Sequence, residues 1–153
     1  MAARGRTYRG YGYIVTERKS DLSITYLLEL YLTNSRCITI GKLGRFLFKK
    51  SHYIYVGSAK KNIMKRIERH LKKEKSKFWH IDYLLQYATI KRVWIGPVPE
   101  EKIARILTKK LKVAVPSFGS SDKQSISHLF LSTGDEDFSH LSFDLLTDLK
   151  NRL

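Results

Sequence analysis

The run of residues 53–59 and the segment behind it constrain the fold more than any other part of the chain. Aromatic and β-branched residues fill positions 53–56 and favour a strand, which ends at Gly57, where the backbone can turn freely. A helical pattern resumes a few residues later and covers residues 64–73. We therefore predict a strand that leads into a basic helix, and a junction between them that presents cations to a phosphate.

Positive charge is concentrated around this junction. Residues 41–77 contain 13 Lys or Arg and two acids, Glu68 and Glu74, which accounts for about +11 of the net charge of +15. A concentrated basic face implies a polyanionic partner, because each neutralised phosphate releases condensed counterions. Nucleic acid is the leading candidate. The alternatives are a solvated basic face and attraction to an anionic membrane surface.

Composition narrows the class of protein further. The chain has 153 residues, of which 42% are hydrophobic, and this fits one compact domain. Its single cysteine, Cys37, excludes a disulfide or a thiolate metal site within one chain, and we expect it to be buried. The N-terminus has no apolar signal region, and no stretch approaches the roughly 18 apolar residues of a spanning helix. We therefore expect a cytoplasmic protein without a membrane partner.

Hydrophobic periodicity predicts a mixture of strands and helices. Residues 23–32 alternate between apolar and polar positions, as in a half-buried strand. Residues 1–21 are expected to form a basic arm, and the acidic tail, residues 133–153, is expected to be helical from Phe138 onward. The remaining predicted elements are strands over residues 37–40, 53–56, 89–95 and 128–132, and helices over residues 64–73, 78–87 and 100–112.

Two tyrosines are candidates for the chemistry of phosphodiester hydrolysis, which needs a positioned water, a base and a cation or metal. Tyr26 and Tyr55 lie on separate predicted strands, and both phenols face one pocket if those strands are neighbours. Either phenol can then position or activate the water. Because a free phenol has a pKa of about 10, a tyrosine base needs positive charge nearby.

The predicted basic helix supplies that charge. Arg66 and His70 are four residues apart and therefore share a face of the helix. Arg66 is the stronger catalytic candidate because a guanidinium makes forked contacts with a phosphate and stays charged, whereas His70 can exchange a proton or donate a hydrogen bond. A solvated basic helix is the alternative interpretation. The position of Glu100 at a helix start is explained by the helix dipole, which favours a carboxylate there. The helical pattern of residues 78–87 is explained by core packing with a hydrogen-bonded His80.

Taken in order, these segments resemble the GIY-YIG nuclease superfamily, and specifically its small stand-alone branch related to the Uri-type endonucleases. Tyr26 stands where the first signature has its tyrosine, residues 55–57 stand at the second signature, and Arg66 stands at the helix arginine of the family. The resemblance covers roughly residues 23–132. Further blocks typical of that branch match residues 40–44, 66–70, 79–84, 118–122 and 127–129.

The resemblance implies an α+β fold in which a small antiparallel three-stranded central sheet is flanked by helices, with residues 22–132 as the nuclease domain. It also implies one divalent metal ion, Mg²⁺ or Mn²⁺, held by a glutamate early in the helix after the sheet. That position falls on Glu100, with Glu101 one register away.

The chain departs from the pattern of the family at three places. Ile24 replaces the usual glycine of the first signature, Ser51 replaces a glycine before the third strand, and Lys123 and Ser125 replace a pair of cysteines. A branched side chain at position 24 implies a narrower pocket or simply a stiffer strand.

The leading hypothesis is a metal-dependent endonuclease that hydrolyses phosphodiester bonds in nucleic acid, with DNA favoured over RNA. Tyr26 or His70 assists the attack of water, Tyr55 orients the reacting groups, Arg66 stabilises the phosphoryl charge and Glu100 holds the metal. Phosphates on either side of the cleaved bond are expected to bind Lys42, Lys60, Lys61, Lys65 and Arg69. The second hypothesis is a non-cleaving DNA- or RNA-binding module on the same fold. A role in DNA repair or mobile-element processing fits the resemblance.

Overall fold

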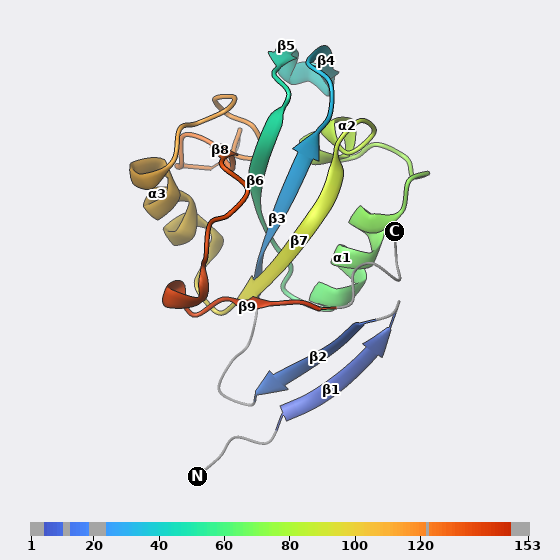
Figure 1. Ribbon diagram of the computed structural model, residues 1–153, viewed down its shortest axis with the longest axis vertical. Coiled ribbons are helices and arrows are strands. Elements are labelled where there is room, and N and C mark those ends of the chain that lie inside the picture. Colours follow the sequence, from blue (N-terminus) through green and yellow to red (C-terminus); the bar gives the residue numbers. More distant parts are fainter. Residues whose placement is uncertain (1–4, 11–12, 19–23, 122, 148–153) are drawn as a thin grey trace.

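The computed structural model describes residues 5–10, 13–18, 24–121 and 123–147 (Figure 1). In chain order the elements are β1 (Gly5–Gly10), β2 (Tyr13–Arg18), β3 (Thr25–Leu32), β4 (Arg36–Ile40), η1 (Gly41–Leu43), β5 (Gly44–Phe48), β6 (Ser51–Ser58), α1 (Ile63–Leu71), α2 (His80–Leu84), β7 (Thr89–Gly96), α3 (Glu100–Lys110), β8 (Leu129–Ser132), η2 (Ser139–Leu141) and β9 (Asp144–Leu145).

Within this described part, five strands form one antiparallel sheet in the order β8-β6-β3-β7-β9. The predicted α+β class is confirmed, but the predicted three-stranded sheet is wrong in its number of strands. β6, β3 and β7 form the expected centre, and β8 and β9 extend its two edges. The sequence predicts β8 as a strand but not its pairing with β6, and β9, with two residues, is too short to leave a pattern.

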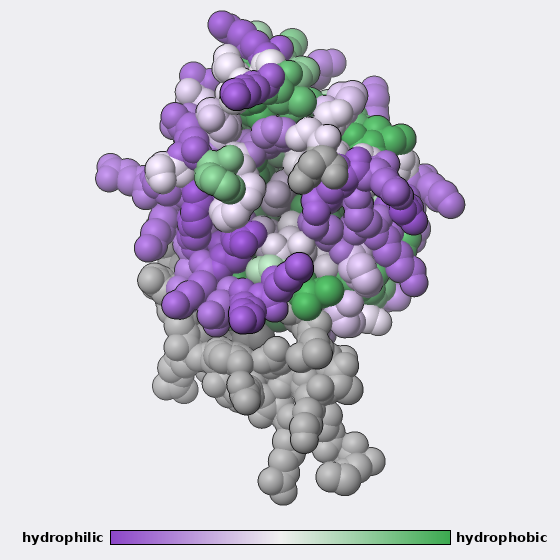
Figure 2. All heavy atoms as spheres, turned by 180° about the vertical axis from the view of Figure 1, so that it is seen from behind, coloured by the Kyte–Doolittle hydropathy of each residue, from purple (hydrophilic) through white to green (hydrophobic). Residues whose placement is uncertain are grey.

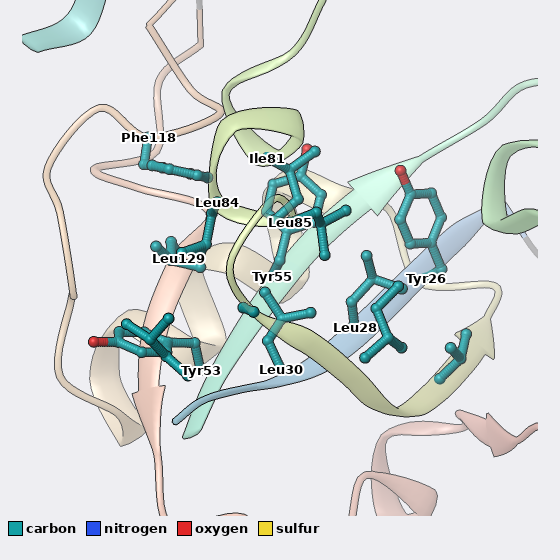
Figure 3. Packing of buried hydrophobic residues seen from close by; sticks show 14 of the residues in the cluster. Tyr26, Leu28, Leu30, Tyr53, Tyr55, Ile81, Leu84, Leu85, Phe118 and Leu129 are labelled. Carbon is teal, nitrogen blue, oxygen red and sulfur yellow. The ribbon is translucent and has the colours of Figure 1, made fainter. Parts of the chain in front are cut away.

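Both faces of β3 are covered, so the predicted half-buried strand is in fact a central one. α1 and α2 lie on one side of the sheet and α3 lies on the other (Figure 1). On the first side, Leu28 and Leu30 pack with Tyr26, Tyr53 and Tyr55 (Figure 3). Ile67 of α1 belongs to the same cluster. On the second side, Leu27 packs with Ile103 of α3. Residues that alternate between two buried faces are typical of a strand in the middle of a sandwich of layers.

A buried acid inside β3 explains why the strand still reads as half-polar. Glu29 has an exposed fraction of 2% and forms an ion pair with Arg92 of the neighbouring strand β7. Burial raises the pKa of Glu29, and the hydrogen bond and charge of Arg92 oppose that rise. The polar residue at position 29 therefore forms a cross-strand ion pair and does not indicate a solvent-facing side of the strand.

The hairpin of β4 and β5 forms a separate two-stranded ladder. Ile38 and Ile40 of β4 are buried, whereas Cys37 is exposed, so the expectation of a buried cysteine is wrong. Successive side chains of a strand point to opposite faces, and this hairpin has one face toward solvent. β1 and β2 pair as another antiparallel hairpin, within the residues predicted to form a basic arm.

The C-terminal segment is extended where the sequence predicts a helix. Its described part contains the 3-10 turn η2 and the strand β9, which pairs with Trp94 and Ile95 of β7. Phe143 is buried against Gly96, where an added Cβ would lie 2.8 Å from the phenylalanine ring. The apolar residues of this segment are thus buried in the core while the backbone is extended. Residues 148–153 lie outside the described part. No helix in the described part is long and apolar enough to cross a membrane.

Candidate active site

A cavity of about 260 Å³ lies where the start of β3 and the end of β6 meet the starts of α1 and α3. It brings together four of the residues proposed from the sequence, although they are spread over 75 positions of the chain: Tyr26, Tyr55, Arg66 and Glu100. The residues that complete its lining are Gly57, Ser58, Trp79, Gly119 and Lys123. The fifth proposed residue, His70, lies behind Tyr26 and is bonded to it.

Strand register places the ring of Tyr26. Tyr26 pairs with Gly57 across the β3–β6 ladder, and its side chain lies over that glycine. A Cβ added at Gly57 would lie 2.4 Å from both Cζ and Oη of Tyr26, far inside van der Waals contact. Gly57 therefore serves a close approach to Tyr26 as well as the end of a strand.

A hydrogen bond of 2.7 Å joins the Tyr26 hydroxyl to Nε2 of His70, which is itself buried on α1. Burial lowers the pKa of His70 to about 3, so its imidazole is neutral near pH 7. Burial also raises the pKa of Tyr26, and the nearby guanidinium of Arg66 opposes that rise. The tyrosine therefore keeps its proton, and its hydroxyl donates to the neutral imidazole in the tautomer that leaves Nε2 unprotonated.

Tyr55 lies beside Tyr26 on the neighbouring strand, as the sequence predicted for sheet neighbours. The two ring centroids are 6.4 Å apart, and both side chains project from the same face of the sheet (Figure 3). The Tyr55 ring packs edge-on against Phe118, and burial raises its pKa well above the usual value of a phenol. It is suited to orienting a reacting group through its hydroxyl and not to ionising.

Arg66 lies in the first turn of α1, and two contacts hold its side chain. Its NH1 donates to the carbonyl of Ser58 at 3.1 Å, and its guanidinium carbon lies 4.3 Å from the centre of the Trp79 ring. A stacked guanidinium keeps its charge and loses little freedom when it binds an anion. Trp79 was expected only to pack in the core, and its position four to five ångströms from two arginine side chains was not encoded in any local pattern.

Arg69, predicted to bind phosphate, is engaged inside the protein. NH1 and NH2 donate to the two carboxylate oxygens of Asp82 at 2.8 and 3.0 Å, and the guanidinium also lies over Trp79. Asp82 is buried and accepts further hydrogen bonds from the backbone N–H groups of Phe78 and Trp79. This pairing fastens α1 to the start of α2. An acid three residues into a helix is a capping signal, which accounts for the backbone bonds of Asp82 but not for its arginine partner.

The two glutamates at the start of α3 have different surroundings, which the sequence left open. Glu100 lines the cavity and accepts a hydrogen bond of 2.8 Å from Nζ of Lys123. Glu101 instead accepts from the backbone N–H of Gln124 at 3.1 Å and lies 3.2 Å from Nε2 of His128. Burial raises the pKa of Glu101, but hydrogen bonds from Ser125 and His128 outweigh it and lower the pKa to about 2. Of the two acids, Glu100 is the one turned to the cavity.

The donor set of the cavity fits a hard divalent cation held by few protein ligands. Within the described residues, no group of three or more His, Cys, Asp and Glu side chains could hold a metal ion. Mg²⁺ is commonly bound by one or two carboxylates, with waters and substrate phosphates completing its shell. The carboxylate of Glu100 can supply the protein share of such a shell, beside the hydroxyls of two tyrosines.

The remaining basic residues proposed from the sequence lie outside the cavity lining. Lys60 and Lys61 are exposed just after β6, and Lys65 is exposed on α1. Lys42 is exposed on η1, whose Gly41 lies against the side chain of Tyr83. Hydrophilic side chains dominate the face of the molecule in Figure 2, with hydrophobic side chains scattered among them.

Two further expectations concern residues near the cavity. Ile24, expected to narrow the pocket, is not one of the residues that line it, and its backbone bonds to Gly96 and Ala59. The stiffer-strand alternative therefore describes its position better. His80 accepts a hydrogen bond of 2.9 Å from the N–H of Gly119, which confirms the expectation of a hydrogen-bonded histidine.

Fold and cavity together define an α+β protein with a polar cavity at one end of its sheet, lined by two buried phenols, a stacked guanidinium and a carboxylate. The sequence matches the family called domain of unknown function DUF123 over residues 25–151, and the chain belongs to that family. No match to the chain was found among curated proteins or among solved structures.

Proposed function

We propose that this protein is a metal-dependent endonuclease of the GIY-YIG type, in the branch related to the Uri-type endonucleases, and that its substrate is DNA in preference to RNA. The observation that carries the proposal is the convergence of Tyr26, Tyr55, Arg66 and Glu100 on one cavity. The first three match the motifs that carry the resemblance, and the fourth stands where the resemblance puts the metal-binding glutamate. The concentrated positive charge of residues 41–77 supports a polyanionic substrate.

Proton transfer in the proposed reaction passes through the Tyr26–His70 hydrogen bond. As a water attacks the phosphorus, its proton goes to the Tyr26 hydroxyl while the phenolic proton goes to Nε2 of His70. Forming an imidazolium in a buried site is unfavourable, and the negative charge of Asp82 offsets part of that burial effect. The relay requires no free phenolate, which suits a tyrosine whose pKa is raised.

Charge on the reacting phosphoryl group is stabilised by Arg66 and by a divalent metal ion. Arg66 presents a guanidinium at the cavity wall, held by Ser58 and by the Trp79 ring. Glu100 is the residue that would hold the Mg²⁺ or Mn²⁺ ion, which when bound supplies positive charge to the phosphoryl oxygens and the leaving group. Tyr55 donates a hydrogen bond that orients the phosphate. The exposed residues Lys60, Lys61 and Lys65 bind the phosphates on either side.

A second candidate function is a nucleic-acid-binding module that does not cleave. The observation in its favour is the pair between Lys123 and Glu100, which neutralises the cavity carboxylate without a metal. Such a module would keep the basic surface and the phosphate-binding arginine, and its affinity would fall steeply with salt.

The deciding experiment is a nicking and cleavage assay on double-stranded, single-stranded and branched DNA and on RNA, each with Mg²⁺ or Mn²⁺. Arg66→Ala and Glu100→Gln should each lower the cleavage rate by roughly 10²–10³-fold, the usual effect of removing one preorganised charge. The exposed Arg105→Ala and Glu74→Gln serve as controls of the same chemistry and should cleave like the wild type. Cleavage that survives in both cavity variants rejects the proposal, and salt-sensitive binding without cleavage establishes the module.

A further inference from the structure

A lysine side chain reaches into the cavity and holds the proposed metal ligand. Nζ of Lys123 lies 2.8 Å from Oε1 of Glu100, and both side chains line the same cavity. The Glu100 side chain is 15% exposed and that of Lys123 is 35% exposed, so the pair sits at the cavity mouth. The pair is thus open to solvent on one side and to the interior of the cavity on the other.

The loop that carries Lys123 is fastened to the start of α3. The backbone N–H of Lys123 donates to Ser120 at 2.9 Å, and the N–H of the next residue, Gln124, donates to Glu101 at 3.1 Å. On the other side of the loop, the Ser125 hydroxyl lies 2.8 Å from Nε2 of His128. These contacts fix the backbone, so movement of the lysine is limited to its own side chain. A four-carbon stem carrying a compact charge can change partners without moving the loop.

An ammonium group and a divalent cation cannot share one carboxylate oxygen without strong repulsion. If a metal binds Oε1 of Glu100, the Lys123 ammonium must leave that oxygen. The Lys123 side chain starts at the cavity mouth. Arg66 lines the same cavity. A phosphate bound to Arg66 would therefore lie in the same cavity as the displaced ammonium.

We propose that Lys123 is an exchangeable cation of this site: it neutralises Glu100 when no metal is present, competes with the metal for that carboxylate, and binds a phosphate of the nucleic acid once the metal has displaced it. This inference rests on the proposed function for its ligand, a nucleic-acid phosphate. It assigns to Lys123 a role in phosphate binding that depends on metal occupancy.

The competition is measured first, without nucleic acid and without turnover. Mn²⁺ binding to the full chain is followed by the electron paramagnetic resonance signal of the free ion, for the wild type and for Lys123→Met, which keeps the length of the stem but removes its charge. The variant should bind Mn²⁺ on the order of tenfold more tightly, because the competing charge is gone. Lys102→Met, on the exposed side of α3, should bind like the wild type. Glu100→Gln should lose the site.

The fate of the displaced lysine is measured next, by the salt dependence of DNA binding in fluorescence anisotropy. In Ca²⁺, which occupies oxygen-ligand sites, Lys123→Met should lower the slope of log K against log salt by about 1 relative to the wild type. Without a divalent ion the two slopes should agree, because the wild-type lysine is then occupied by Glu100. Lys123→Arg should retain the wild-type slope in Ca²⁺.

These measurements separate this inference from the proposed function. Equal Mn²⁺ affinity in the wild type and in Lys123→Met overturns the competition, unchanged affinity in Glu100→Gln overturns the assignment of Glu100 as the ligand, and an unchanged slope in Ca²⁺ overturns the contact with phosphate. If no substrate is cleaved, yet Lys123→Met tightens Mn²⁺ binding and lowers the slope in Ca²⁺, the endonuclease proposal fails while the exchange of cations stands. Circular dichroism of each variant confirms that the exposed substitution leaves the fold intact.

Discussion

Lowering the pH should destabilise this protein through His70, because the buried imidazole resists protonation in the folded state. His70 is 3% exposed, and burial lowers its pKa from 6.5 to about 3. Charged groups around it act in both directions: Asp82 raises the pKa, whereas Lys75, Arg69 and Arg66 lower it. Between these two pKa values the unfolded chain binds a proton that the folded protein does not, so stability falls as the pH falls.

The size of this effect follows from the difference between the two pKa values. Each pKa unit corresponds to about 1.4 kcal/mol, and a drop from pH 7 to pH 5 crosses only the upper part of the window, so His70 should account for a loss of about 2 kcal/mol. Other groups titrate in the same range, and a variant without the imidazole isolates the contribution. His70→Gln keeps a side chain able to accept the Tyr26 hydrogen bond and cannot gain a proton.

The assay is urea unfolding of the wild type and of His70→Gln at pH 7 and at pH 5. The free energy of unfolding of the wild type should fall by about 2 kcal/mol more than that of the variant. His140→Gln, which changes an exposed histidine, should retain the wild-type loss. An equal fall in the wild type and in His70→Gln would show that the imidazole is hydrated or already charged in the folded state, and the description of a neutral acceptor for Tyr26 would be wrong.

Three further substitutions test how the cavity and the sheet are held, each by urea unfolding. Gly57→Ala should destabilise the fold by about 1–3 kcal/mol, because its Cβ overlaps the Tyr26 ring and forces that ring off its hydrogen bond. Asp82→Asn should cost about 2–3 kcal/mol by leaving Arg69 without its ion pair, less than a fully buried pair because Arg69 is partly exposed. Phe143→Ala should cost about 3–5 kcal/mol, because that ring closes the sheet beside β7.

Matched changes at neighbouring or exposed positions give the controls for these three substitutions. Ser58→Ala follows Gly57 on β6, Asp135→Asn changes an exposed acid, and Leu47→Ala truncates a large apolar side chain that is 61% exposed. Each control should stay within about 0.5 kcal/mol of the wild type, as surface changes usually do. A control that is as costly as its partner would mean that the interaction assigned to the buried residue does not explain its effect.

The strand–helix core of this fold was predictable because its residues carry strong local patterns. β-branched and aromatic residues mark β6, and basic residues with helical spacing mark α1, so both elements appear close to where they were expected. The C-terminal tail shows the limit of such patterns. Its leucines have helical spacing, yet Phe143 and Leu146 are buried in an extended chain beside β7. Tertiary burial decided the conformation there, and periodicity cannot report it.

The members of the cavity were predictable, but the way they are held was not. That Tyr26 and Tyr55 share a face follows once their strands are neighbours, whereas the pairing of Tyr26 with Gly57 depends on a register that sequence alone does not fix. The Arg69–Asp82 pair joins helices whose packing is a tertiary property. In the sequence, Lys123 stands out only because it replaces a cysteine of the GIY-YIG pattern. Its contact with Glu100 spans 23 positions and becomes visible only in the folded chain.

In the proposed reaction, the metal affects not only phosphate binding but also the pKa of Tyr26, through the charge at Glu100. Burial has the largest effect on the Tyr26 pKa and raises it, Arg66 lowers it, and the negative charge of Glu100 raises it further. A cation bound at Glu100 cancels that last contribution, and so does Lys123 while it is paired there. A divalent metal brings one more positive charge than the lysine it replaces, so the exchange makes loss of the phenolic proton easier when substrate chemistry can begin. Under the proposed function, proton transfer from Tyr26 to His70 is therefore easier with a metal at Glu100 than with Lys123 there.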